Sequence, residues 1–200
     1  MRETATNLEA PGQLAVAFAN TLASDRPGRD LLTTDAQLCS WVDGRASLIG
    51  PVTHLRQRLE DYRGLRAAIR GLLSAAAADQ PLQDGDLAVI NARVAAAVSW
   101  PELRIADDGK LSIVSRHGAE DASARMLGLI AESAIRLVGG PDRERLGVCD
   151  GPGCRRFFLA AHRGRRWCDS GVCGNRVRVA RWARRRRGET AQPTKKTVSQ

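Results

Sequence analysis

Apolar positions in the first 140 residues recur mostly at intervals of three and four, which is typical of amphipathic helices. On the first of these segments, for example, Leu14, Phe18 and Leu22 share one face. Pro81 stops one helix, and the sequence Gly139-Gly140-Pro141 closes the last. The pattern predicts helices at about 13–23, 35–42, 53–78, 84–99 and 119–138.

One segment changes period. Residues 102–115 alternate apolar and polar side chains, which predicts two strands of a hairpin. A three-residue loop over 107–109 places Ile105 opposite Leu111 and Leu103 opposite Ile113, so that all four share one apolar face. It also puts Gly109 at the left-handed position of the turn, so we prefer it to a two-residue loop.

The predicted organisation is therefore two folded parts and a tail. Residues 1–145 form a mainly helical domain with one β-hairpin, which could bind an effector or mediate assembly. Residues 146–188 form a small C-terminal zinc finger that ends in a basic helix. Residues 189–200 are polar and are expected to be disordered.

Composition narrows the class of protein. Hydrophobic residues make up 43% of the 200, which argues against a wholly disordered chain. No apolar run approaches the ~18 residues that cross a bilayer. The first residues lack the basic start and apolar stretch of a secretory signal, so we expect a cytoplasmic protein without membrane contact.

Charge is concentrated at one end of the chain. Residues 1–148 hold 17 Lys and Arg against 19 Asp and Glu, whereas residues 149–200 hold 14 against 3. Such asymmetry indicates an attached element that binds nucleic acid or a membrane surface.

Four of the five cysteines lie within the same basic region. Cys149 and Cys154 are separated by four residues, and so are Cys168 and Cys173. Two close pairs of thiolates are what a tetrahedral zinc site needs, and four thiolates leave no open position for catalysis. We predict one structural Zn²⁺; unrelated thiols or two disulfides are the alternatives, and His162 is a weaker candidate ligand because it lies in a turn.

The order of segments resembles a treble-clef finger. A turn-forming loop over 150–153 precedes an expected strand at 155–159, a turn and a return strand at 165–167. The second cysteine pair then leads into a helix over 177–187. At a helix N-terminus, the thiolate form of Cys173 is favoured.

Arginines of this finger form the candidate nucleic-acid surface, since guanidinium groups bind phosphates and guanine edges. They are Arg155, Arg156, Arg163, Arg165, Arg166, Arg176, Arg178, Arg181, Arg184 and Arg185. Duplex DNA is the favoured partner. An RNA-binding or ribosome-associated factor is the alternative, and exposure of two or more of the finger's large aromatic side chains would favour it. These are Phe157, Phe158, Trp167 and Trp182.

A third hypothesis is a thiol redox switch, in which oxidation of the cysteines releases zinc. An enzyme is not predicted, because the sequence has no nucleophile–base pair, phosphate-binding loop or open metal site. In the helical domain, Asn20, Thr21, Asp35 and Trp41 could line a pocket for a small effector or could serve as caps and core. A homodimer is plausible for a regulator.

Specific motifs connect the chain to a bacterial family. Arg166-Trp167-Cys168 and the quartet Cys173-Gly174-Asn175-Arg176 resemble the CGNR zinc finger. Residues 14–25, 31–44 and 55–73 resemble the ABATE domain that accompanies this finger. The resemblance implies a stress-induced transcription regulator that binds DNA.

Overall fold

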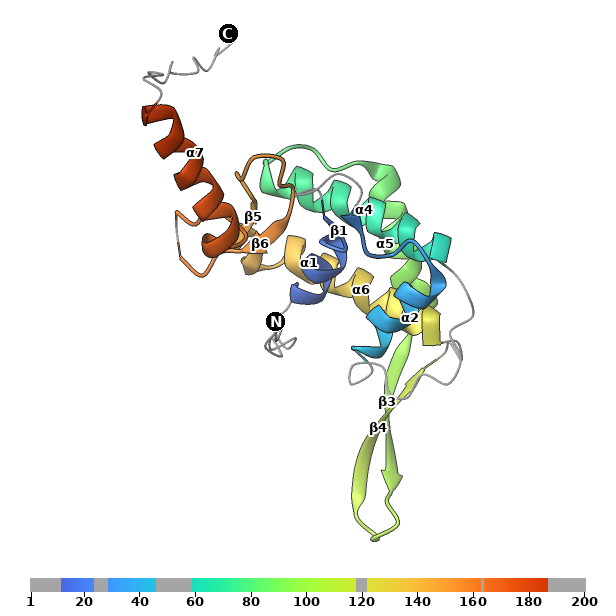
Figure 1. The fold of residues 1–200 in the computed structure, drawn as a ribbon. Helices are drawn as coiled ribbons and strands as arrows, with labels where there is room; N and C mark the ends of the chain where they lie inside the picture. The colour runs from blue at the N-terminus through green and yellow to red at the C-terminus, as the bar shows by residue number, and fades with distance from the viewer. Residues whose placement is uncertain (1–11, 24–28, 46–58, 118–121, 163, 187–200) are drawn as a thin grey trace.

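The computed structural model describes residues 12–23, 29–45, 59–117, 122–162 and 164–186. Figure 1 shows a helical body from which a long hairpin projects at one end and a helix at the other. The principal helices are α1 (Gln13–Ala19), α2 (Asp35–Asp43), α4 (Leu59–Ala77), α5 (Asp84–Ala96), α6 (Ala122–Gly139) and α7 (Asn175–Arg186). Two shorter helical turns are η1 (Pro141–Arg145) and η2 (Ser170–Gly174).

The described strands form three antiparallel pairs. They are β1 (Leu22–Ala23) with β2 (Arg29–Asp30), β3 (Ser99–Ile105) with β4 (Leu111–His117), and β5 (Leu146–Val148) with β6 (Phe157–Leu159). The mainly helical fold with a hairpin is confirmed, but the sequence patterns did not predict the β1–β2 and β5–β6 pairs. The strands of these pairs have only two residues (β1) and three residues (β5) each, too few for an alternating pattern to be recognised.

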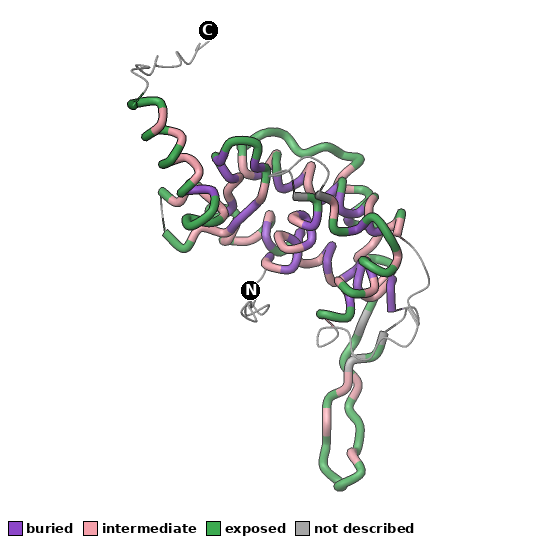
Figure 2. The backbone as a smooth tube through the Cα atoms, in the orientation of Figure 1, coloured by how far each residue is buried: buried purple, intermediate pink, exposed green. Residues whose placement is uncertain are grey.

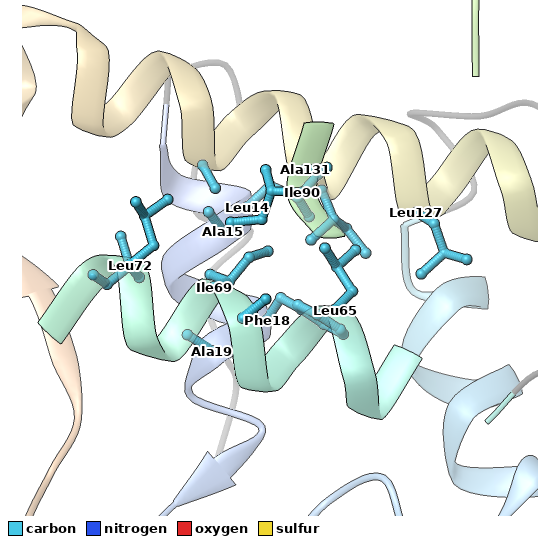
Figure 3. Close-up of a cluster of buried hydrophobic side chains, with 14 of the residues drawn as sticks. Leu14, Ala15, Phe18, Ala19, Leu65, Ile69, Leu72, Ile90, Leu127 and Ala131 are labelled. Carbon is cyan, nitrogen blue, oxygen red and sulfur yellow. The ribbon is translucent and has the colours of Figure 1, made fainter. Parts of the chain in front are cut away.

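The core is built where α1 packs against α4 and α6, with α5 closing the other side of those two helices. Phe18 of α1 is fully buried and points toward Leu65 and Ile69 of α4 (Figure 3). Its ring also meets those of Trp41 and Tyr62, with centroids 5.3 and 6.2 Å away. Figure 2 shows that burial is confined to this body and to the base of the C-terminal finger.

A buried ion pair ties the β1–β2 segment to α4. The Arg66 guanidinium, of which only 5% is exposed, donates to both carboxylate oxygens of Asp30, each at 2.6 Å. Arg66 also donates to the hydroxyl of Thr21, which donates in turn to the carbonyl of Phe18. The hydrogen bond from Arg66 holds the pKa of Asp30 below its ordinary value, although partial burial opposes this.

Several helix ends differ from the sequence prediction. The helix predicted over 13–23 ends at Ala19, and the chain turns into β1. The helix predicted to reach residue 99 ends at Ala96, because Ser99 already pairs with His117 in the hairpin. The helices predicted at 53–78 and 119–138 are observed over Leu59–Ala77 and Ala122–Gly139, and their first residues lie outside the described part.

The hairpin, here called the arm (residues 99–117), has the predicted register. Ile105 pairs with Leu111 and Leu103 with Ile113, and Gly109 has a φ of 77°. The predicted shared apolar face is confirmed, and its four side chains are exposed to between 68% and 75%. The reason is that the arm projects beyond the helical body and has nothing of that body to pack against (Figure 1).

No helix among the described residues has both the length and the apolar character needed to span a membrane.

Replacing Asp30 with Asn tests the buried ion pair. The change leaves Arg66 charged and buried without its counter-ion, so we expect a loss of about 3–5 kcal/mol in the free energy of unfolding at neutral pH. The lowered pKa of Asp30 means that its stabilisation is complete above the unfolded-state pKa and is lost as the pH falls through the folded-state value.

Thermal unfolding of both proteins across a pH series measures this effect. The difference in stability between the natural protein and the Asp30 variant should become smaller below about pH 4 and be constant near neutrality. If this difference in stability stayed the same in acid, the stabilisation would not come from the ionised Asp30 carboxylate.

Candidate zinc centre and basic helix

The four clustered cysteines converge from two loops of the finger. Cys149 follows β5, Cys154 precedes β6, Cys168 follows the segment over 164–167, and Cys173 lies in the turn η2 just before α7. Their sulfur atoms all lie within 4.8 Å of one another. All four are free thiols, which contradicts the disulfide alternative, and His162 is exposed and outside the cluster.

The spacing of the sulfurs fits zinc. Sulfurs placed about 2.3 Å from a central Zn²⁺ at the corners of a tetrahedron lie ~3.8 Å apart. The Sγ atoms of Cys154 and Cys168 are 3.8 Å apart, and those of Cys168 and Cys173 are 3.7 Å apart. A disulfide would need about 2.05 Å. The cluster can hold one Zn²⁺ with every ligand position filled by sulfur, as a structural site requires.

The first loop is shaped by the β5–β6 pair. The N–H of Cys149 donates to the carbonyl of Arg156 at 2.9 Å, which continues the strand pairing up to the first ligand. The N–H of Cys154 then donates to the carbonyl of Gly151 and closes the turn. A Cβ on Gly151 would lie 3.3 Å from the sulfur of Cys173, so a side chain there would crowd the cluster.

The second loop is shaped by a cap. The carboxylate of Asp169 accepts a hydrogen bond from the N–H of Val172 at 2.8 Å, which starts the turn that carries Cys173. This turn runs directly into α7, so the helical region begins earlier than the predicted residue 177. Gly174 lies close to the ring of Trp167, and a Cβ on Gly174 would come within 3.3 Å of that ring.

The strand pairing of the finger differs from the sequence prediction. Residues 165–167 were expected to return alongside 155–159, but β6 pairs with β5 instead. Arg165 holds the 165–167 segment in place through its side chain, which donates to the carbonyls of Trp167 and Cys168 at 2.9 and 2.5 Å. Its guanidinium also lies 4.8 Å from the ring of Phe158. The Arg165 side chain therefore donates to backbone carbonyls that a neighbouring strand would otherwise have bonded.

Burial and crowding control ionisation of the thiols. Burial raises the pKa of Cys173 to about 11 and raises that of Cys168 as well. Burial also opposes ionisation of Cys149, but hydrogen bonds from the backbone of Cys168 and Gly151 and from the side chains of Cys168 and Cys154 together lower its pKa. Four thiolates at this distance require a compensating cation, so binding of Zn²⁺ expels the remaining thiol protons.

Strand β6 joins the finger to the helical body, because its consecutive side chains point to opposite sides. Phe157 is buried in the core of the helical body, together with Leu146 of β5. Phe158 is buried against the cysteine cluster. Asn20, at the end of α1, pairs with Phe157 as a strand would: its amide donates to the carbonyl and its oxygen accepts from the N–H, both at 2.9 Å.

The predicted nucleic-acid arginines fall into groups. Arg165 is committed to the finger's backbone, Arg166 forms an ion pair with Asp150 at 2.8 Å, and Arg156 is half-buried. Arg176 and Arg178 are only weakly engaged, through backbone carbonyls at 3.5 and 3.2 Å. Within the described residues, no hydrogen bond or ion pair engages the side chains of Arg155, Arg181, Arg184 and Arg185, which are exposed. Arg163 lies outside the described part.

The candidate pocket residues of the helical body each have structural contacts. Asn20 binds the backbone of Phe157, and Thr21 is buried in the network of Arg66. Asp35 lies in the first turn of α2, whose cap is Thr34. The ring of Trp41 packs on Phe18 and beneath the guanidinium of Arg45, 3.9 Å from the ring centroid. Their proposed role in binding an effector stays a prediction.

Comparison with known families assigns the chain. Residues 12–141 match the ABATE family, whose description is "putative stress-induced transcription regulator". The chain belongs to the ABATE family. Residues 145–186 match the CGNR zinc finger, so the resemblance drawn from the motifs is confirmed, and neither is a family of enzymes. No curated protein matches the chain significantly.

Replacing Cys168 with Ser tests the zinc site of the CGNR finger. Loss of one of four thiolates should lower zinc affinity by more than ~100-fold and unfold the finger, because metal binding supplies much of the folding free energy of so small a module. Metal analysis of the purified protein and competition with a chromogenic chelator measure this directly.

Cys39→Ser is the matched control, since Cys39 is half-buried on α2 and lies outside the cluster. It should retain one Zn²⁺ per chain. Equal zinc content in the two variants would contradict the four-cysteine assignment.

Replacing Asn20 with Ala tests the connection between the ABATE domain and the CGNR finger. The change removes both hydrogen bonds to Phe157, and we expect a loss of about 1–3 kcal/mol in the free energy of unfolding. Since Phe157 precedes Phe158 on one strand, zinc should also be lost faster to a chelator.

Thermal unfolding and the kinetics of zinc release provide the two readouts. Asn91→Ala, which changes an exposed asparagine on α5, should affect neither. Unchanged zinc release in the Asn20 variant would show that the two cores are not coupled.

Proposed function

We propose that this chain is a DNA-binding transcription regulator whose zinc-stabilised CGNR finger places α7 on duplex DNA. The observation that carries the proposal is the charge of this helix. Its twelve residues include six arginines and no acidic residue. Arg178, Arg181 and Arg185 lie at helical spacing, where like charges repel and destabilise the helix. A polyanion on this face would relieve the repulsion.

Geometry supports a duplex partner. Twelve residues give a helix about 18 Å long, and the major groove of B-DNA, about 12 Å wide, admits an α-helix. α7 projects from the body with its far end clear of the ABATE domain (Figure 1). Contacts of Arg181, Arg184 and Arg185 with phosphates would supply affinity, and guanine edges are the base feature that arginine reads best.

The finger's aromatic side chains support DNA over RNA. Phe157 and Phe158 are buried and Trp167 is half-buried, whereas Trp182 is 59% exposed. Readers of single-stranded RNA stack several bases on exposed rings, and one exposed ring of these four does not provide that surface. The guanidinium of Arg186 already lies 4.8 Å from the ring of Trp182.

The ABATE domain would then supply regulation. Its core shares β6 with the finger, so a small effector or a second copy acting on the domain has a direct path to the DNA-binding end. The proposal is for a non-catalytic cytoplasmic protein. Its zinc is structural, since the four sulfurs leave no position for a substrate.

Selection from a random pool of duplex DNA by the zinc-loaded protein tests the function. We expect an enriched motif that contains guanine, and Arg181→Ala should weaken binding to it. If Arg181 contacts one phosphate, the slope of log affinity against log salt should fall by about 0.9.

Arg136→Ala is the control, because Arg136 is also an exposed arginine but lies on α6 of the ABATE domain, away from the finger. It should leave the affinity and the slope unchanged. A pool without enrichment, or tighter binding to a single-stranded RNA competitor, would overturn the proposal.

A further inference from the structure

The arm exposes an apolar surface that the helical body does not cover. Leu103, Ile105, Leu111 and Ile113 stand on one face of its two strands, and each is exposed to between 68% and 75%. Pro101, on the same face by register, is also exposed. Water-exposed leucine and isoleucine are common as single residues, but four adjacent ones mark an interaction surface.

The size of this face indicates the strength of the contact it can make. A leucine or isoleucine side chain buries roughly 60–120 Å² of apolar surface, so the four together offer on the order of 300 Å². That is about the largest apolar patch of a typical monomer. Two such faces together fall below the ~1,200 Å² of a standard stable complex, which predicts a weak, concentration-dependent association.

The charge of the arm indicates which kind of partner binds its apolar face. Residues 98–117 contain three acidic and three basic side chains, so the arm has no net charge to attract DNA or an acidic surface. Glu102 pairs with Arg104 and Arg116 on the opposite side of the sheet, and Lys110 pairs with Asp108 at the tip of the arm. The four paired residues Leu103, Ile105, Leu111 and Ile113 are apolar and uncharged, so this part of the face is complementary to itself, as the interface of a symmetric dimer requires.

We infer that the apolar face of the arm is the contact with a second copy of this chain. Two arms would stack face to face, which leaves the charged side of each sheet in water. The arm and α7 project from opposite ends of the molecule (Figure 1). Both basic helices therefore stay free in the dimer. This inference gives a surface to the assembly role proposed for the ABATE domain and does not depend on DNA binding.

Sedimentation velocity of the zinc-loaded full chain without DNA, over a wide range of protein concentration, tests the inference. The natural protein should convert from monomer to dimer as its concentration rises. Changing Ile105, Leu111 and Ile113 to Thr removes most of the apolar face while keeping side chains that favour strands. We expect the dissociation constant of the dimer to rise by ~100-fold or more.

The matched control changes Val89, Val98 and Ile135 to Thr, since these three are also exposed but lie off the apolar face. It should dimerise like the natural protein. Equal circular dichroism and melting temperature would show that all variants fold.

Hydrogen exchange of the natural protein gives a second measurement that needs no variant. Amides of the arm should become more protected as concentration rises. A chain that stays monomeric throughout, which would leave the face to a different partner, overturns the inference, and so does a dimer that the arm variant leaves intact. Failure of the DNA selection would leave all these outcomes unchanged.

Discussion

The structure depends on one three-residue strand that belongs to two cores at once. β6 buries Phe157 among the helices and Phe158 against the cysteines, because successive side chains of a strand point to opposite faces. Asn20 fixes the position of this strand by imitating the hydrogen bonds of a strand neighbour. The orientation of the metal-binding loop, and through it that of α7, follows from how the helical body packs.

The arginines have different roles in different parts of the molecule. Arginines near the metal are largely engaged: Arg165 holds the backbone and Arg166 pairs with Asp150. In the helical body, Arg66 is neutralised by Asp30. Among the described residues, the exposed arginines that pair with no acidic side chain are mostly those of α7, since those elsewhere largely form ion pairs. Unpaired positive charge is thus concentrated on α7, which projects from the helical body (Figure 1).

Much of this could be predicted from the sequence. Helical periodicity gave the helices, and Cys149, Cys154, Cys168 and Cys173 gave the metal site because their spacing alone limits the chemistry. Gly109 and the alternation around it gave the register of the arm. The β5–β6 pairing was missed, since Leu-Gly-Val is too short to carry a pattern and its partner was assigned to another segment. The exposure of the arm could not be predicted, because periodicity shows which residues share a face but not what lies opposite it.

Leu146 and Phe157 have a consequence for how this protein can be divided. Both follow residue 145, the natural place to cut between the two family matches, yet both complete the helical core. A fragment ending there would lose Leu146 and Phe157 from its core, and the detached finger would expose both side chains to water. The ABATE domain and the finger are therefore not interchangeable modules. Replacing one of them with the corresponding part of a related protein would require matching changes in the core residues of the other.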